Sequence, residues 1–155
     1  MGIEIERKFL LLDDSWRTYV NGQTKIVQGY LATTESSSIR VRIQGEVANL
    51  NIKSMTIGVS RAEFEYPIPI ADAEDILANL CKRPKIEKTR HYIKQDTHTW
   101  EIDVFEGDNR GLIVAEIELT AINEEFKRPA WLGQEVSDDE RYYNVSLVKY
   151  PFKDW

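Results

Sequence analysis

Charged residues of one sign recur two positions apart in six strand-like segments, and this spacing constrains the fold of the chain more than any other feature. Side chains two positions apart in a β-strand point to the same face, so each pair shares a face opposite mostly apolar residues. A single face of this kind is typical of any solvated antiparallel sheet. Such a sheet gains by mixing charges of both signs, however, whereas here the signs are segregated strand by strand. The pairs are Glu4/Glu6, Arg40/Arg42, Glu63/Glu65, Lys88/Arg90, Glu101/Asp103 and Glu116/Glu118.

Eight strand-like segments in succession predict a mostly antiparallel barrel or a strongly curved sheet. Turn-forming pairs such as Asn21-Gly22 separate several of them. A helix is predicted at 72–82, where acidic residues come first and Lys82 and Arg83 come last, and a short one at 13–20. Residues 123–131, which Pro129 interrupts, and residues 138–150 are predicted to form short helices or helical turns. In the segment 13–20, Trp16 and Tyr19 are expected to face inward. The predicted strands are 3–11, 25–32, 38–44, 48–54, 61–68, 86–95, 99–105 and 112–120.

Length and composition favour one compact domain over residues 1–155. Hydrophobic residues make up 42% of the chain, which argues against disorder, and the net charge of −6 argues against binding to a nucleic-acid backbone. Cys81 is the one cysteine, so an intrachain disulfide or a cysteine-based zinc site is excluded. No apolar run approaches the roughly 18 residues of a membrane helix, and no signal-peptide core is visible. These observations predict a cytoplasmic protein without a membrane partner.

Closure of the sheet with its charged face inward would create a lumen that needs a charged occupant. Six cations and eight carboxylates would share that surface. Arginine and lysine suit phosphate oxygens, and carboxylates suit Mg²⁺ or Mn²⁺, which in turn bridge phosphates. A polyanion accompanied by divalent cations would therefore balance both sets of charges. The cations are Lys8, Arg40, Arg42, Lys53, Lys88 and Arg90, and the carboxylates are the members of the four acidic pairs.

An ordered series of motifs resembles the CYTH superfamily, the triphosphate tunnel metalloenzymes. The series begins with Glu4-x-Glu6-x-Lys8 and continues in order to Pro129-x-Trp131-Leu132-Gly133-x-Glu135-Val136 and Tyr142/Tyr143-Asn144. The resemblance covers nearly the whole chain and implies an α+β, mostly β fold. Its centre would be an eight-stranded antiparallel β-barrel, or tunnel, with a charged lumen and a few flanking helices. The intermediate motifs are Gln28-Gly29-Tyr30-Leu31, Ile39-Arg40-Val41-Arg42, Ile52-Lys53-Ser54, Arg61-Ala62-Glu63-Phe64-Glu65, Ile86-Glu87-Lys88-Thr89-Arg90, Glu101 to Gly107 and Gly111 to Glu118.

The resemblance also implies roles for the charged residues. Catalytic roles fall to Lys8, Tyr30, Glu63 and Glu65, although Tyr30 is also explained as a half-buried barrel residue. Glu63, Glu65, Glu101 and Asp103 are equally explained as holding the fold, and Arg61 and Glu135 are expected to form structural pairs. The expected substrate-binding residues are Lys8, Arg40, Arg42, Lys53, Lys88 and Arg90. The expected ligands of Mg²⁺ or Mn²⁺ are Glu4, Glu6, Glu101, Asp103, Glu116 and Glu118.

The function implied by the resemblance is metal-dependent hydrolysis of a triphosphate by water attack on a phosphoryl group. The chain lacks an obvious insertion that could recognise a base or thiamine, which favours inorganic tripolyphosphate. The alternatives are a class IV-type adenylyl cyclase, a thiamine or nucleoside triphosphatase, and a non-enzymatic polyphosphate-binding protein. The expected partner is a small molecule that bears a triphosphate. The sequence leaves the oligomeric state open, with a homodimer as one alternative.

Overall fold

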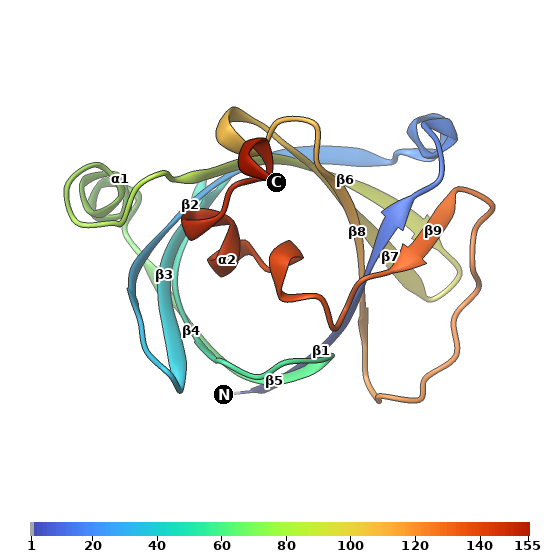
Figure 1. Cartoon of the computed structure of the whole chain (residues 1–155), viewed down its shortest axis with the longest axis horizontal. Coiled ribbons are helices and arrows are strands. Elements are labelled where there is room, and N and C mark those ends of the chain that lie inside the picture. Colours follow the sequence, from blue (N-terminus) through green and yellow to red (C-terminus); the bar gives the residue numbers. More distant parts are fainter. Residues whose placement is uncertain (1) are drawn as a thin grey trace.

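Eight antiparallel strands close into a barrel in the computed structural model, which describes residues 2–155 (Figure 1). Their order around the ring is β5-β4-β3-β2-β6-β7-β8-β1, and pairing of β1 with β5 closes it. This architecture confirms the predicted tunnel, and each predicted strand corresponds to one strand of the barrel. The strands are β1 (Gly2–Leu11), β2 (Gly22–Thr33), β3 (Ser37–Gln44), β4 (Val47–Ser54), β5 (Ser60–Ile68), β6 (Ile86–Gln95), β7 (His98–Phe105) and β8 (Ile113–Leu119).

A ninth strand, β9 (Leu132–Glu135), was not predicted and shares one edge of β1 with β5. The first residues of β1 pair with β5 as far as Ile5, and β9 pairs with Phe9 and Leu11. Between these two partner strands, backbone groups on this edge of β1 form individual hydrogen bonds with residues that belong to no strand. At Lys8, the backbone carbonyl accepts from Val136 N at 2.8 Å, and the backbone N–H donates to Ser137 Oγ at 2.9 Å.

Helix α1 (Ile70–Asn79) lies on the outside of the barrel (Figure 1), and apolar side chains cover the barrel there. Ala73 and Leu77 of α1 are buried against Val41 of β3 and Ala48 of β4. The helix is predicted from its acidic start and apolar spacing, and it lies within the predicted segment 72–82 apart from its first two residues. Close packing requires Gly29 on β2, because a Cβ atom there would lie 2.9 Å from the side chain of Cys81.

A second apolar cluster covers the outside of β1, β7 and β8. Phe9, Trp16, Trp100 and Trp131 are buried in it, and their rings meet partly edge to face. Trp16 belongs to the 3₁₀ helix η1 (Ser15–Tyr19), and it faces inward as predicted. The expectation for Tyr19 is wrong, because that side chain is 61% exposed.

At 123–131, where short helices or helical turns are predicted, no helix forms and only isolated turns occur. The structure has turns and irregular chain there, and then β9. Pro129 lacks the N–H that a helix needs, and its ring disfavours helical geometry at the residue before it. Side chains of this segment complete the second apolar cluster instead, since Phe126 packs edge to face on Phe9 and Trp100.

The C-terminal segment crosses one end of the barrel (Figure 1). The short helices or helical turns predicted at 138–150 are confirmed as the 3₁₀ helix η3 (Glu140–Tyr142) and helix α2 (Asn144–Lys149). Leu147 of α2 is fully buried in a third cluster with Tyr30 and Phe105. The short 3₁₀ helices η2 (Gly107–Asn109) and η4 (Phe152–Asp154) lie at the same end, where Phe152 N donates to Asn109 Oδ1 at 2.9 Å.

No helix within residues 2–155 has both the length and the apolar character needed to span a membrane.

Candidate active site

The barrel turns its charged residues inward, around a cavity of about 260 Å³. Because the register places the same-sign pairs of neighbouring strands on this inner face, the structure brings together nearly all of the predicted site residues. Asp103 lines neither this cavity nor the next one. A smaller cavity of about 60 Å³ adjoins the first and is lined by Lys8 and Tyr30, among others. The charged residues lining the larger cavity are Glu4, Glu6, Arg40, Arg42, Lys53, Glu63, Glu65, Lys88, Arg90, Glu101, Glu116 and Glu118.

One wall of the lumen carries arginines with unused donors. Arg40 is buried, with 7% of its surface exposed, and within residues 2–155 it has no ion pair. The Nε atoms of Arg40 and Arg42 are both buried and lack a hydrogen-bond partner in the described chain. Burial lowers the pKa of Arg42, and the neighbouring positive charges of Arg40 and Arg90 lower it further. Buried cationic donors without acceptors are costly, so this wall is suited to receive an anion.

Two carboxylates beside this wall are held in place by an amide. Asn51 Nδ2 donates to Glu65 Oε2 at 2.7 Å and to Glu63 Oε1 at 3.2 Å. Glu65 also lies 3.6 Å from Arg42 Nη2. Glu63 and Glu65 therefore have fixed positions at the larger cavity, where they can orient a water molecule or an ion.

The opposite wall has its charges paired around Asp103. Arg90 donates to both oxygens of Asp103, from Nε at 2.8 Å and from Nη2 at 3.0 Å, and Lys88 Nζ lies 2.7 Å from Oδ2. Asp103 is fully buried. Burial lowers the pKa of Lys88 to about 8, against the attraction of Asp103. With both oxygens occupied, Asp103 acts here as an internal counter-ion, which is the structural alternative raised by the sequence.

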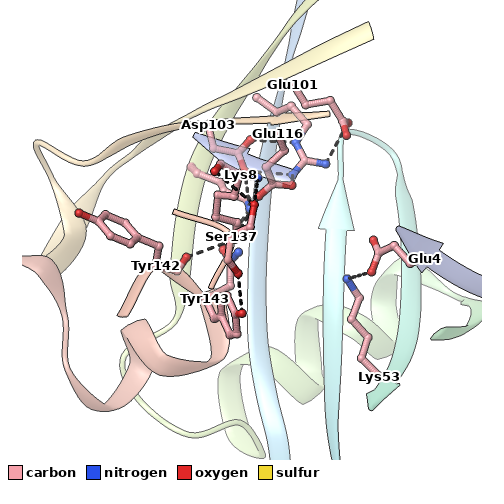
Figure 2. Close-up of polar contacts among 12 residues, drawn as sticks. Glu4, Lys8, Lys53, Glu101, Asp103, Glu116, Ser137, Tyr142 and Tyr143 are labelled. Atoms are coloured by element: carbon pink, nitrogen blue, oxygen red, sulfur yellow. Dashed lines mark hydrogen bonds and ion pairs between the residues drawn. The ribbon is translucent and has the colours of Figure 1, made fainter. Parts of the chain in front are cut away.

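Three acidic side chains lie near one another between the two walls. Burial, reinforced by Glu116 and Glu4, raises the pKa of Glu6 to about 8. Burial alone would also raise the pKa of Glu116, but Lys8 and Arg90 hold it far below its usual value. Glu4 Oε2 lies 2.9 Å from Lys53 Nζ but is buried without a well-oriented hydrogen bond from the described residues (Figure 2).

These carboxylates fit a divalent cation by their chemistry. Hard cations prefer carboxylate oxygens, and a cation would replace the proton that Glu6 otherwise retains and the ammonium of Lys53 that now pairs with Glu4. No group of three or more His, Cys, Asp or Glu side chains between residues 2 and 155 is arranged to hold a metal ion. The argument for a divalent cation therefore depends on the carboxylate chemistry of Glu4, Glu6 and Glu116 and on the repulsion among their charges, and not on a ready-made coordination geometry.

Lys8 lines the smaller cavity and pairs with Glu116, which lines the larger one. Its Nζ lies 3.4 Å from Glu116 Oε1 and donates to the backbone carbonyl of Tyr142 at 3.2 Å (Figure 2). Tyr30 is 3% exposed and lies opposite Arg40 in the β2–β3 register. Lys8 and Tyr30 therefore both reach the smaller cavity, although no hydrogen bond joins them in the described chain.

Sequence reasoning gave no role to the amide side chains that support the site. Asn144 Oδ1 accepts from both Gln28 Nε2 and Lys88 Nζ at 3.1 Å, so the C-terminal segment reaches into the lumen. Asn144 lines both cavities. The alternating pattern of β2 puts Gln28 on the same face as Tyr30, which was a usable signal. Nothing in the local pattern around Asn144 indicates that this segment folds back over the barrel.

Comparisons with known proteins agree with the geometry. The CYTH domain pattern matches residues 2–148. An inorganic triphosphatase of Acetivibrio thermocellus is 43% identical over 155 residues, which is all of this chain and 99% of that protein. An inorganic triphosphatase of Nitrosomonas europaea is 37% identical over 94% of this chain and 96% of its own length.

Solved structures show the same fold. The crystal structure of an inorganic triphosphatase superposes with a TM-score of 0.66 at 34% identity, covering 96% of this chain and 95% of its own. A Hippeastrum protein, described as a putative adenylyl cyclase with a dominant triphosphatase activity, superposes with a TM-score of 0.59 at 16% identity. That match covers 78% of this chain and 80% of the other. At this identity the second likeness concerns the fold alone.

Proposed function

This chain belongs to the CYTH domain family, and we propose that it is an enzyme that hydrolyses linear triphosphates, with inorganic tripolyphosphate as its substrate. The observation that carries the proposal is the wall of buried, unpaired arginine donors facing carboxylates across one cavity. Two relatives named inorganic triphosphatase that match over nearly the whole chain support it. We also propose that residues 1–155 act as one tunnel domain, because β1 closes the ring and the C-terminal segment caps it.

The cationic residues of the lumen are proposed to bind the phosphate chain. Arg40 and Arg42 offer Nε donors that are free within residues 2–155, and a guanidinium can bind phosphate oxygens through two parallel hydrogen bonds. Lys53 lies beside them and would exchange its contact with Glu4 for a phosphate oxygen. Lys88 and Arg90 line the same cavity but are already paired with Asp103, so they supply positive potential more than free donors.

A divalent cation, Mg²⁺ or Mn²⁺, is proposed to be held by Glu4, Glu6, Glu116 and Glu118, which all line the cavity. When bound, it would neutralise phosphate oxygens and so stabilise the charge that develops during transfer. Glu101 lines the same cavity and is a further candidate ligand, although one oxygen accepts from Arg90. Asp103 is removed from this set because its two oxygens are occupied and it lines neither cavity.

The chemical step is proposed to begin from the smaller cavity. Its volume of about 60 Å³ exceeds the roughly 15 Å³ that one water molecule needs, so it can hold the attacking water next to Lys8 and Tyr30. The water oxygen attacks the terminal phosphorus, the bond from phosphorus to the bridging oxygen breaks, and pyrophosphate leaves. Glu63 and Glu65, fixed by Asn51, line the adjoining larger cavity, so they are the candidates to accept the proton of a water that attacks from the side where the two cavities meet.

Phosphate release from tripolyphosphate tests the proposal. Purified protein with Mg²⁺ or Mn²⁺ should release phosphate in a malachite-green assay, and EDTA should stop the reaction until the metal is restored. The same assay with ATP and thiamine triphosphate measures the preference for the inorganic substrate. Absence of turnover with any linear triphosphate in either metal would refute the enzyme. Tight metal-independent binding by calorimetry would then favour a polyphosphate-binding protein, and cyclic AMP formed from ATP faster than phosphate from tripolyphosphate would favour a cyclase.

A further inference from the structure

Lys8 is held at both of its ends by one short segment of the C-terminal region. Its backbone N–H donates to Ser137 Oγ at 2.9 Å, and its ammonium donates to the carbonyl of Tyr142 at 3.2 Å (Figure 2). Lys8 lies on the edge of β1 where neither β5 nor β9 pairs. A serine hydroxyl there takes the place that a neighbouring strand would occupy in a continuous sheet.

The hydroxyl of Ser137 has a defined orientation. Ser137 is 6% exposed, and its Oγ donates to Glu135 Oε2 at 2.7 Å. Glu135 is in turn bound by the Arg7 guanidinium through two contacts, one of them from Nε to Oε2 at 2.8 Å. Because the serine proton is directed to Glu135, the oxygen lone pairs remain free to accept from Lys8 N–H. Arg7 and Glu135 are partly exposed, so these contacts connect the protein surface with the Lys8 backbone.

The segment that carries these contacts is tied to itself and to the barrel. Tyr143 OH donates to the carbonyl of Ser137 at 2.6 Å, which closes residues 137–143 into a ring. The same hydroxyl accepts from the backbone N–H of Gly58 at 3.0 Å. The ring therefore cannot shift without moving the anchor of Lys8 Nζ as well as that of its backbone.

From this arrangement we infer that Ser137 is a positioning residue for Lys8, oriented by Glu135 and Arg7. The inference rests on the proposed function, in which Lys8 acts beside the attacking water. Ser137 does not reach the larger cavity and touches no proposed ligand. It acts by fixing the strand position from which the Lys8 side chain extends, and small displacements of a reacting group carry large rate costs.

The test compares Ser137→Ala with Ser137→Thr, which retains the hydroxyl, in the tripolyphosphate assay at saturating Mg²⁺. Loss of the hydrogen-bond partners that orient metal ligands typically costs about 10- to 100-fold in metal affinity or activity, and we expect the same scale for a partner that orients Lys8. We expect Ser137→Ala to lower kcat by about that factor with an unchanged KM, and Ser137→Thr to restore most of it. Glu135→Gln should lower kcat less, and the double variant Ser137→Ala/Glu135→Gln should be no slower than Ser137→Ala, because both changes act through one hydroxyl.

Asn109→Ala is the matched control for stability. It removes another buried side-chain acceptor of a backbone N–H, that of Phe152, and Asn109 lines neither cavity. It should lower the melting temperature as Ser137→Ala does and leave kcat unchanged. Equal kcat values for the two variants would overturn the inference. So would a loss that threonine does not restore while the protein remains folded, or independent, multiplying effects of Ser137→Ala and Glu135→Gln.

Hydrogen exchange at the Lys8 amide separates this inference from the proposed function. The amide should be protected in the wild type and in Asn109→Ala and should exchange faster in Ser137→Ala. If the wild type hydrolyses no triphosphate, the proposed function fails, but this result would still support the anchoring of Lys8 by Ser137. If Ser137→Ala keeps full protection at Lys8, the positioning role is wrong whatever the activity.

Discussion

The two walls of the lumen use the same residue types in opposite ways. On one wall, Lys88 and Arg90 form ion pairs with the fully buried carboxylate of Asp103. On the other wall, Arg40 and Arg42 keep Nε donors that no residue in 2–155 satisfies. A buried ion pair with completed hydrogen bonds is self-sufficient, whereas a buried cation without an acceptor is suited to a ligand. The difference separates charges that hold the barrel from charges that bind its occupant.

Asp103→Ala should have the largest effect on stability. It leaves Lys88 and Arg90 buried without their main partner, and breaking a buried pair by removing one member costs about 3–5 kcal/mol. Denaturant unfolding of the metal-free protein measures this, with Asp103→Asn as a milder variant that keeps the shape. A loss of less than about 1 kcal/mol for Asp103→Ala would show that the paired wall is not structural and would remove the contrast between the walls.

Arg40→Ala should show the reverse pattern. Losing a charge-assisted contact to phosphate should reduce kcat/KM by about 1.5–3 kcal/mol, or roughly 10- to 150-fold. The unfolding free energy of the ligand-free protein should fall by less than for Asp103→Ala, because Arg40 has no ion pair in the described chain to lose, although burial is outweighed by Tyr30, Glu4 and Glu63, which raise its pKa. Steady-state kinetics and thermal melting of the same preparation check both halves. A destabilised variant with normal kcat/KM would place Arg40 with the structural charges.

Glu6→Gln tests the charge balance between the walls through pH. The folded-state pKa of Glu6 is about 8, against 4.5 for an unperturbed glutamate. The folded protein therefore binds the extra proton between these values, and its stability falls as pH rises from about 4.5 to 8. Glutamine cannot lose a proton, so the variant should lack this part of the fall.

The measurement is unfolding at pH 5 and pH 9 in EDTA. At the higher pH, the unfolding free energy of Glu6→Gln should exceed that of the wild type by at least about 1 kcal/mol. A shift of one pKa unit corresponds to about 1.4 kcal/mol, so this threshold is a low one. Its neighbours Glu116, Glu4, Lys53 and Lys8 are unchanged in both proteins, so the difference isolates Glu6. An identical pH dependence in the two proteins would mean that Glu6 is solvated. Retention of wild-type activity across a Mg²⁺ titration would remove it from the metal ligands.

The sequence predicted the barrel and its charged lumen because both depend on alternation, which is a local property of each strand. It placed Glu4, Arg40 and Glu116 on the inner face correctly for that reason. It could not separate the two walls, since Asp103 becomes a counter-ion only when β6 and β7 pair Arg90 directly opposite it. For a related reason, a helix was expected at 123–131 where none forms, and the roles of Ser137 and Asn144 were not predicted. That part of the chain takes its conformation from packing on β1 and across the barrel end.

Glu101→Gln should have the smallest effect on stability, and its effect on activity tests whether Glu101 belongs with the paired charges around Asp103 or with the metal ligands. One of its oxygens accepts from Arg90 Nη1 at 3.0 Å, and its side chain is 25% exposed, yet it lines the larger cavity. Glu101→Gln keeps an oxygen that can accept from Arg90, and Asp103 still holds that arginine, so stability should change by less than about 1 kcal/mol. If Glu101 is only the outer member of the paired wall, activity should follow the wild type at every Mg²⁺ concentration. If it is a metal ligand, half-maximal activity should need more Mg²⁺ while stability in EDTA stays unchanged. A Mg²⁺ titration of tripolyphosphate hydrolysis, paired with melting in EDTA, therefore assigns Glu101 to one wall or to the cation.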